Sequence, residues 1–336
     1  MTPPLFGTKT VGVPMKVPSA FSISKLHLSG METFNRIVPE GTIRSFLCGI
    51  MMSMTPGRSK SGISVQPRDL DILCGLYESR IMTRAHLAAL YFDDKPEATK
   101  KRVQALLRAG YLAERSRQPN EPAILYLAKL GYDLIHERGL LSQFPQRNWR
   151  SFQKRVNVSD ATIRHELAVQ NIKASFASSI RQTEHLTLAE FSTWPKMYEF
   201  RTTRPVTENG WTNHKEVLMK PDSFIRIHEQ EPDGGLSEHV LFLELDRGTE
   251  TIQTVVNKAI GYREYYRSGG FAKKCGIKVE DYRQCPFRVL LVFQGKARSE
   301  KIQLLLKDSH LQLHSQVICI LYKDCRMFIN GFPIAS

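Results

Sequence analysis

A short apolar segment that ends in two acids restricts the folds open to this chain. Residues 240–246 read Val-Leu-Phe-Leu-Glu-Leu-Asp, which is typical of a buried strand. Side chains alternate along a strand, so we expect Glu244 and Asp246 on one side and the leucines on the other. Asp222 follows a proline upstream, and a hairpin would bring it beside these acids. Acids buried together need a cation to neutralise them, so the segment predicts a divalent-metal site that acts on phosphate.

The charge balance indicates a polyanionic partner. Lysine and arginine number 47 against 33 acids, which gives a formal net charge of +14 at pH 7. Nucleic acid is the commonest partner of such a chain, and we expect double-stranded DNA. An anionic membrane is the alternative, but the sequence shows neither an amphipathic basic helix nor an apolar anchor. The prediction is therefore DNA binding without membrane association.

The cysteine pattern favours reduced thiols. The chain has six cysteines, none in a C-x-x-C pair, and no histidine cluster has zinc spacing. No signal peptide precedes the first apolar run. We expect a cytoplasmic protein, although Cys275 and Cys285 could form a disulfide in an oxidising compartment.

Residues 1–65 differ from the rest of the sequence. Prolines recur through this stretch, and amphipathic periodicity is weak. The segment is predicted to be a disordered leader or translated sequence upstream of the true start, since Met51, Met52 and Met54 stand just before the first regular pattern.

Residues 66–140 predict a winged helix-turn-helix. Three helical patterns come first, with Thr83 as the cap of the second and Gly110 just after the third. Strands at 111–115 and 123–128 and a helix at 130–138 follow. Three helices and a β-hairpin are the layout of this DNA-binding motif.

The third helix, predicted at 96–109, has the position of a recognition helix. Its outward arc holds Lys100, Lys101, Gln104 and Arg108. Gln104 and Arg108 have base-reading chemistry, whereas the two lysines suit phosphates. The predicted DNA contacts also include Arg115 and Arg117, in the turn between the two strands that would form the wing. The alternative is a solvated basic face on an ordinary helical domain.

Residues 141–158 are predicted to be a basic linker, and residues 159–330 an α/β domain with a central mixed sheet. Ser159 caps a long helix in which His165, Val169, Ile172 and Phe176 form a stripe. Strands are predicted at 186–191, 217–227, 240–246, 287–293 and 317–322, and helices at 251–266 and 299–307. The fold class is thus α/β (α+β overall), with the helical unit first.

Three strings resemble the plasmid replication-relaxation family: Lys220-Pro-Asp222, Phe242-Leu-Glu244-Leu-Asp246-Arg-Gly-Thr-Glu250 and Lys258-Ala-Ile-Gly-Tyr262. The resemblance runs from Pro67 to the C-terminus. It implies a winged helix joined to a domain similar to the restriction-endonuclease, or PD-(D/E)xK, fold.

That resemblance implies a metal site. Glu166, Asp222 and Glu244 would hold Mg²⁺ or Mn²⁺, which would activate a water and stabilise charge on the phosphate. In this fold a lysine normally follows the glutamate by two residues, but here that place is Asp246. The substitution argues against cleavage, although Lys258 of the next helix could compensate, one turn before Tyr262.

Each acid also has a structural interpretation. Asp222 could be a turn residue, and Glu244 and Asp246 could pair with Lys258 and Arg247. His165 fits a core histidine better than a ligand. Taken singly, each acid favours its structural interpretation, and only the acids taken together favour a functional site.

Three functions stay open. The first is a DNA-binding accessory protein for replication and relaxation of a plasmid or other mobile element, with a relaxase or replication initiator as the partner that the resemblance implies. The second is a metal-dependent endonuclease or nickase. The third is a winged-helix transcriptional regulator with a non-catalytic α/β domain.

Overall fold

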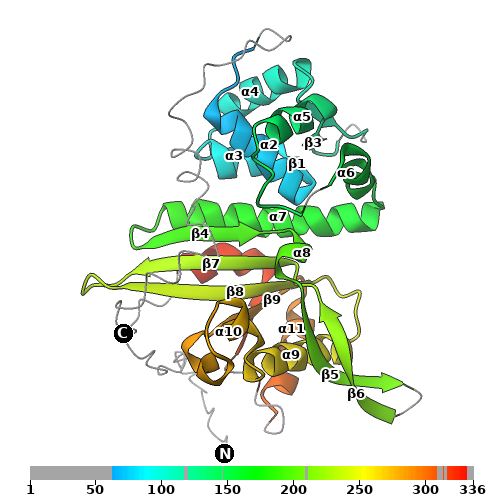
Figure 1. Cartoon of the computed structure of the whole chain (residues 1–336), viewed down its shortest axis with the longest axis vertical. Coiled ribbons are helices and arrows are strands. Elements are labelled where there is room, and N and C mark those ends of the chain that lie inside the picture. The colour runs from blue at the N-terminus through cyan, green and yellow to red at the C-terminus, as the bar shows by residue number, and fades with distance from the viewer. Residues whose placement is uncertain are drawn as a thin grey trace, which may run out of the picture.

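A helix of 22 residues, α7 (Asp160–Arg181), separates a small helical unit from a β-sheet (Figure 1). The computed structural model describes residues 63–116, 120–145, 147–208, 211–308, 313 and 316–330. Most of the predicted leader, residues 1–62, lies outside them. None of the described helices is both long and apolar enough to cross a membrane.

The helical unit precedes α7. Its elements are α2 (Pro67–Ser79), β1 (Ile81–Thr83), α3 (Arg84–Tyr91), α4 (Pro96–Arg108), β2 (Leu112–Glu114), β3 (Ile124–Leu127), α5 (Lys129–Glu137) and α6 (Trp149–Val156). The three strands form a small antiparallel sheet in the order β1-β3-β2. The helices and the hairpin follow the predicted order, and β1 is an additional short strand.

Local signals explain where these helices begin and end. The Thr83 side chain accepts a hydrogen bond from His86 N, which caps α3 as predicted. Pro96 lies in the first turn of α4. Gly110 follows the helix with φ +75°, a backbone conformation that favours glycine. Thr99, Val103 and Leu106 form the buried face of α4.

Residues 141–158 do not form a simple linker. They contain α6, and its Phe152 and Val156 lie in the core of the helical unit. Phe152 stacks on Tyr77 with ring centroids 5.1 Å apart. The four-residue spacing of Phe152 and Val156 is that of one helix face, which explains why this basic segment packs as a helix.

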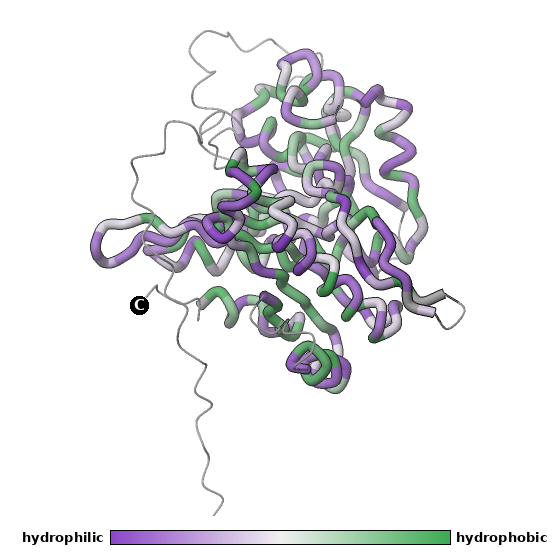
Figure 2. The backbone as a smooth tube through the Cα atoms, turned by 60° about the horizontal axis from the view of Figure 1, so that its bottom comes forward, coloured by the Kyte–Doolittle hydropathy of each residue, from purple (hydrophilic) through white to green (hydrophobic). Residues whose placement is uncertain are grey.

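The second part of the chain is built on a five-stranded mixed sheet, which confirms the predicted fold class. Its strands are β4 (Leu186–Ser192), β7 (Ser223–Gln230), β8 (Leu236–Asp246), β9 (Arg288–Phe293) and β10 (Val317–Leu321), in the order β10-β9-β8-β7-β4. The β8–β9 and β9–β10 pairs are parallel, and the others are antiparallel. The β7–β8 hairpin extends beyond the body with a hydrophilic tip (Figure 2).

Helices cover both faces of this sheet. The helices α7 and α12 (Cys325–Asn330) pack on one face, where Leu241, Leu243 and Leu245 are buried. The helices α9 (Ile252–Arg267) and α11 (Lys296–Leu306) pack on the other, together with Phe242. Short helical segments complete the chain: α8 (Pro195–Tyr198), α10 (Gly270–Lys274), η3 (Val279–Gln284) and η4 (Tyr322–Asp324).

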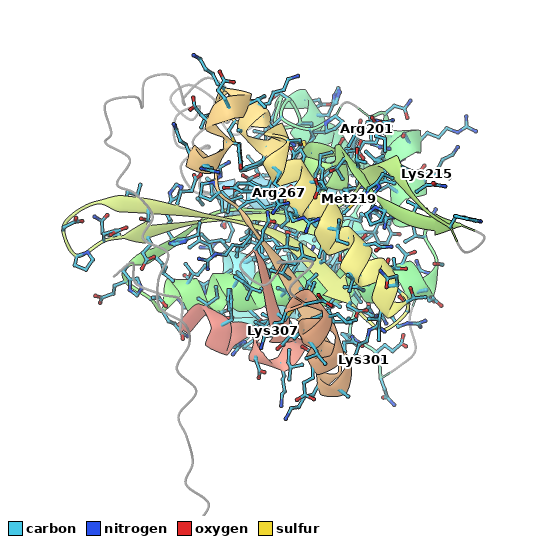
Figure 3. The ribbon with its side chains drawn as sticks, turned by 90° about the horizontal axis from the view of Figure 1, so that it is seen from below. Arg201, Lys215, Met219, Arg267, Lys301 and Lys307 are labelled. Carbon is cyan, nitrogen blue, oxygen red and sulfur yellow. The ribbon has the colours of Figure 1, made fainter. Side chains whose placement is uncertain are left out.

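A two-stranded ribbon was not predicted. It consists of β5 (Phe200–Glu208) and β6 (Trp211–Met219), and it lies beside α9 in Figure 3. Thr202 Oγ1 donates a hydrogen bond of 3.0 Å to Gly261 O, so the ribbon is anchored on that helix. The predicted strand at 217–227 is instead divided between β6 and β7. Pro221 lies at the break, and proline lacks the N–H that a sheet ladder needs.

Polar contacts join the helical unit to α7. Lys173 Nζ lies 3.3 Å from Glu78 Oε2, and Lys173 is 1% exposed. His86 Nε2 and Asn171 Oδ1 are 2.7 Å apart. Because these buried groups satisfy one another, the helical unit is fixed against the helix that also covers the sheet.

Candidate functional site

The hairpin of β7 and β8 brings Asp222 beside Glu244. Ser223 pairs with Leu243, and Asp222 N donates a hydrogen bond of 3.0 Å to Leu243 O. The Asp222 side chain also enters the ladder, because its Oδ2 accepts a hydrogen bond of 2.7 Å from Leu245 N. Two predicted site acids therefore meet at the end of adjacent strands.

Glu244 is the buried member of this pair, with 6% of its surface exposed. Its Oε1 accepts a hydrogen bond of 2.6 Å from the Tyr262 hydroxyl, and its Oε2 lies 3.2 Å from Lys258 Nζ. Burial raises the pKa of Glu244, and the ammonium group of Lys258 opposes that rise. Burial, reinforced by the charge of Glu244, raises the pKa of Tyr262 far above its ordinary value.

Lys258 bridges two carboxylates. Besides Glu244 it contacts Glu250, with 2.9 Å between Lys258 Nζ and Glu250 Oε2. Burial disfavours its charged form, but the two glutamates outweigh this effect and raise the pKa of Lys258. Lys258 and Tyr262 both reach Glu244 from successive turns of α9, so the one-turn spacing seen in the sequence places both on the acid.

His165 supplies the contact from α7. Its Nε2 lies 2.8 Å from Asp222 Oδ1. The hydrogen bond with Asp222 raises the pKa of His165, against the effect of burial. The sequence interpretation favoured a core histidine. Val169, Ile172 and Phe176 of the same helix face do lie in the core. His165 lies nearer the start of α7 and contacts Asp222 instead.

Asp246 has a separate partner. It faces the same side of β8 as Glu244, as predicted, but it binds Arg298 of α11, with 2.5 Å between Arg298 Nε and Asp246 Oδ2. Asp246 Oδ1 also accepts a hydrogen bond of 2.8 Å from Gly248 N. Arg298 neutralises the acid that stands in the lysine position. Sequence reasoning did not find Arg298, because nothing in the spacing links α11 to β8.

Glu166 does not join Asp222 and Glu244 by a direct contact. Its Oε1 lies 3.4 Å from the guanidinium of Arg80, at the end of α2. Burial raises the pKa of Glu166, and Arg80 and Arg155 oppose this. The acid predicted as a metal ligand therefore pairs with the helical unit.

The oxygen atoms of Asp222 and Glu244 are already bound by protein groups. His165, Leu245 N, Tyr262 and Lys258 each occupy one of them. Across the part of the chain that the structure describes, no three His, Cys, Asp or Glu side chains are placed to hold a metal ion. In this arrangement the donor set does not fit Mg²⁺ or Mn²⁺, which need free oxygen ligands. The metal remains a prediction from the resemblance.

The outer face of α4 carries the predicted DNA contacts. Lys100, Lys101 and Arg108 are exposed, and Gln104 is half-buried. None of these four side chains has a hydrogen-bond or ion-pair partner among the described residues. Arg102 points the other way, and its Nε donates a hydrogen bond of 2.8 Å to the buried Asp69.

The predicted wing is only partly described. Arg115 ion-pairs with Asp160 at the start of α7, 3.1 Å between Arg115 Nη2 and Asp160 Oδ1. Arg117 lies outside the described residues. Arg115 thus has a protein partner that a DNA contact would have to replace.

Comparison with known proteins shows the family to which this sequence belongs. No curated protein matches the sequence significantly. The family model described as replication-relaxation matches residues 73–279, which is more than half of the 336 residues and includes α4, Asp222, Glu244 and Lys258. The chain belongs to the replication-relaxation family.

Proposed function

We propose that this protein binds duplex DNA through α4 and acts as an accessory protein in the replication and relaxation of a plasmid or other mobile element. The helical unit would serve as a winged helix, with α4 as its recognition helix and the cytoplasm as its location. A relaxase or a replication initiator would be the protein partner. Family membership supports the role in replication, and the face of α4 supports the DNA contact.

The free cations of α4 carry this proposal. An exposed lysine on a helix can pair with an acid one turn away, as Lys129 does with Asp133. Lys100, Lys101 and Arg108 have no such ion pair among the described residues, while Arg102 between them supplies the ion pair to α2. Arg102 therefore stabilises the fold, whereas Lys100, Lys101 and Arg108 are available to bind a polyanion.

An electrophoretic mobility shift assay tests the proposal. Lys101→Ala combined with Arg108→Ala is expected to weaken binding to duplex DNA by at least about tenfold, since each contact to phosphate or a base edge contributes on the order of 1 kcal/mol. The matched control combines Lys301→Ala on α11 with Lys307→Ala immediately after this helix, which lies across the sheet from α4 (Figure 1). Equal loss in both double variants would show that only net charge matters.

A nickase is the second candidate, because Asp222 and Glu244 converge at adjacent strand ends as the resemblance implies. Supercoiled plasmid incubated with the protein and Mg²⁺ or Mn²⁺ separates the two functions. Open circles that disappear with Asp222→Ala would establish nicking. Unchanged supercoiled plasmid, with DNA binding intact, is the result that the accessory role predicts.

A further inference from the structure

We propose that the ammonium group of Lys258 is the resident cation of the Asp222–Glu244 cluster, and that it takes the place of the divalent ion that these acids would otherwise bind. The inference concerns the acid cluster alone. It does not depend on DNA binding by α4.

The position of Lys258 supports this assignment. Its Nζ lies 3.2 Å from Glu244 Oε2 and 2.9 Å from Glu250 Oε2, so one ammonium group bridges two carboxylates. Bridging acids from different segments is the geometric role of a bound divalent ion. The side chain of Lys258 is 28% exposed and that of Glu244 is 8% exposed, so Lys258 lies between the buried acid and solvent.

Protein cations already offset much of the negative charge of this cluster without an added ion. Lys258 faces Glu244 and Glu250, and His165 faces Asp222. The remaining acid of the strand end, Asp246, is neutralised separately by Arg298. A divalent ion added to this set would have to displace a charged lysine, which leaves two positive groups competing for the same carboxylates.

The fold holds Lys258 in this position. The Thr251 side chain accepts a hydrogen bond of 3.1 Å from Thr254 N, which fixes the start of α9 immediately after Glu250. Val255 and Ala259 on the same helix are buried in the core. Tyr262 then binds the second oxygen of Glu244 from the following turn. The helix thus delivers a cation and a hydroxyl donor to one acid.

Removal of the lysine gives a direct test. Lys258→Gln keeps a side chain of similar length but leaves Glu244 and Glu250 without a cation, so the melting temperature is expected to fall. Mn²⁺ is then expected to bind the variant and raise its melting temperature with increasing concentration, because a ligand that binds only the folded state stabilises it. Thermal melting and calorimetric titration with Mn²⁺ measure both effects in the full chain.

Two further variants make the outcome decisive. Lys258→Gln combined with Asp222→Asn should lose the Mn²⁺ response, and Lys301→Gln on α11 should behave as wild type. The wild-type protein is expected to show no saturable Mn²⁺ binding and at least a tenfold weaker response than Lys258→Gln. Saturable wild-type binding that Asp222→Asn abolishes would overturn the proposal, and so would an absence of Mn²⁺ binding in Lys258→Gln. If that variant does not fold, Lys258→Met in the presence and absence of Mn²⁺ supplies the same comparison, and unfolded protein in both conditions counts against the proposal.

Discussion

Tyr262 donates a hydrogen bond of 2.6 Å to Glu244, and both side chains are buried between β8 and α9. This bond joins the helix to the strand that carries the acid. Loss of the hydroxyl would leave one oxygen of a buried carboxylate without a donor, which is more costly than the loss of an exposed hydrogen bond.

Tyr262→Phe is therefore expected to lower the free energy of unfolding by about 1–3 kcal/mol. Tyr266→Phe on the same helix is the control, because its hydroxyl has no hydrogen-bond partner among the described residues. Denaturant unfolding followed by circular dichroism measures both variants. Equal stability of the two would mean that Glu244 gains little from the phenol.

Adjacent cations on α4 are expected to behave differently. Arg102→Ala leaves Asp69, which is 0% exposed, without its charged partner, and it should cost on the order of 3 kcal/mol of stability. Lys101→Ala removes an exposed side chain and should stay within about 0.5 kcal/mol of wild type. Urea unfolding distinguishes them, and a large loss with Lys101→Ala would contradict the division of roles on α4.

The backbone at Arg80 gives a prediction that separates strain from charge. Arg80 has φ +68°, a region that side chains with a Cβ rarely occupy, and it pairs with Glu166. Arg80→Gly and Arg80→Ala both remove the ion pair, but only glycine relieves the strain. The glycine variant is expected to be more stable by about 1 kcal/mol. Thermal unfolding tests this ranking, which a more stable alanine variant would reverse.

The His165–Asp222 contact predicts a dependence of stability on pH. The pKa of His165 is raised above its ordinary value of 6.5 by its hydrogen bond with Asp222. Folding therefore favours the protonated form. The resulting stabilisation is fully present below pH 6.5 and is lost as pH rises through the raised pKa.

His165→Gln removes this titration. The difference in unfolding free energy between wild type and the variant should be largest near pH 6, and it should shrink as pH increases beyond the folded-state pKa. Chemical unfolding at a series of pH values measures it. A difference that stays constant with pH would show that the pKa of His165 is the same in the folded and the unfolded protein, which contradicts the raised pKa.

The sequence predicted the features that depend on local rules. Thr83 and Ser159 cap their helices, and alternation along β8 places Glu244 and Asp246 on one side. These outcomes follow from side chains that act on their own backbone or on adjacent positions of one strand. The central strands β8 and β9 also follow, because each carries a continuous apolar run.

Contacts between segments far apart in the sequence could not be predicted from these local rules. Arg298 binds Asp246 across 52 positions, and His165 binds Asp222 across 57, so no spacing within one element reveals them. The β5–β6 ribbon was missed because its strands are rich in polar residues and one face is exposed. Its stability comes from α9, which only the tertiary fold brings beside it.

The salt dependence of DNA binding shows whether α4 contacts the phosphates of the duplex. The logarithm of the affinity should fall linearly with the logarithm of salt concentration, and each phosphate contact removed should reduce the slope by about 1. We expect a shallower slope for Lys100→Ala combined with Lys101→Ala than for wild type, and an unchanged slope for Lys301→Ala combined with Lys307→Ala. Identical slopes for wild type and the α4 variant, measured by fluorescence anisotropy on one duplex, would contradict a DNA contact through α4.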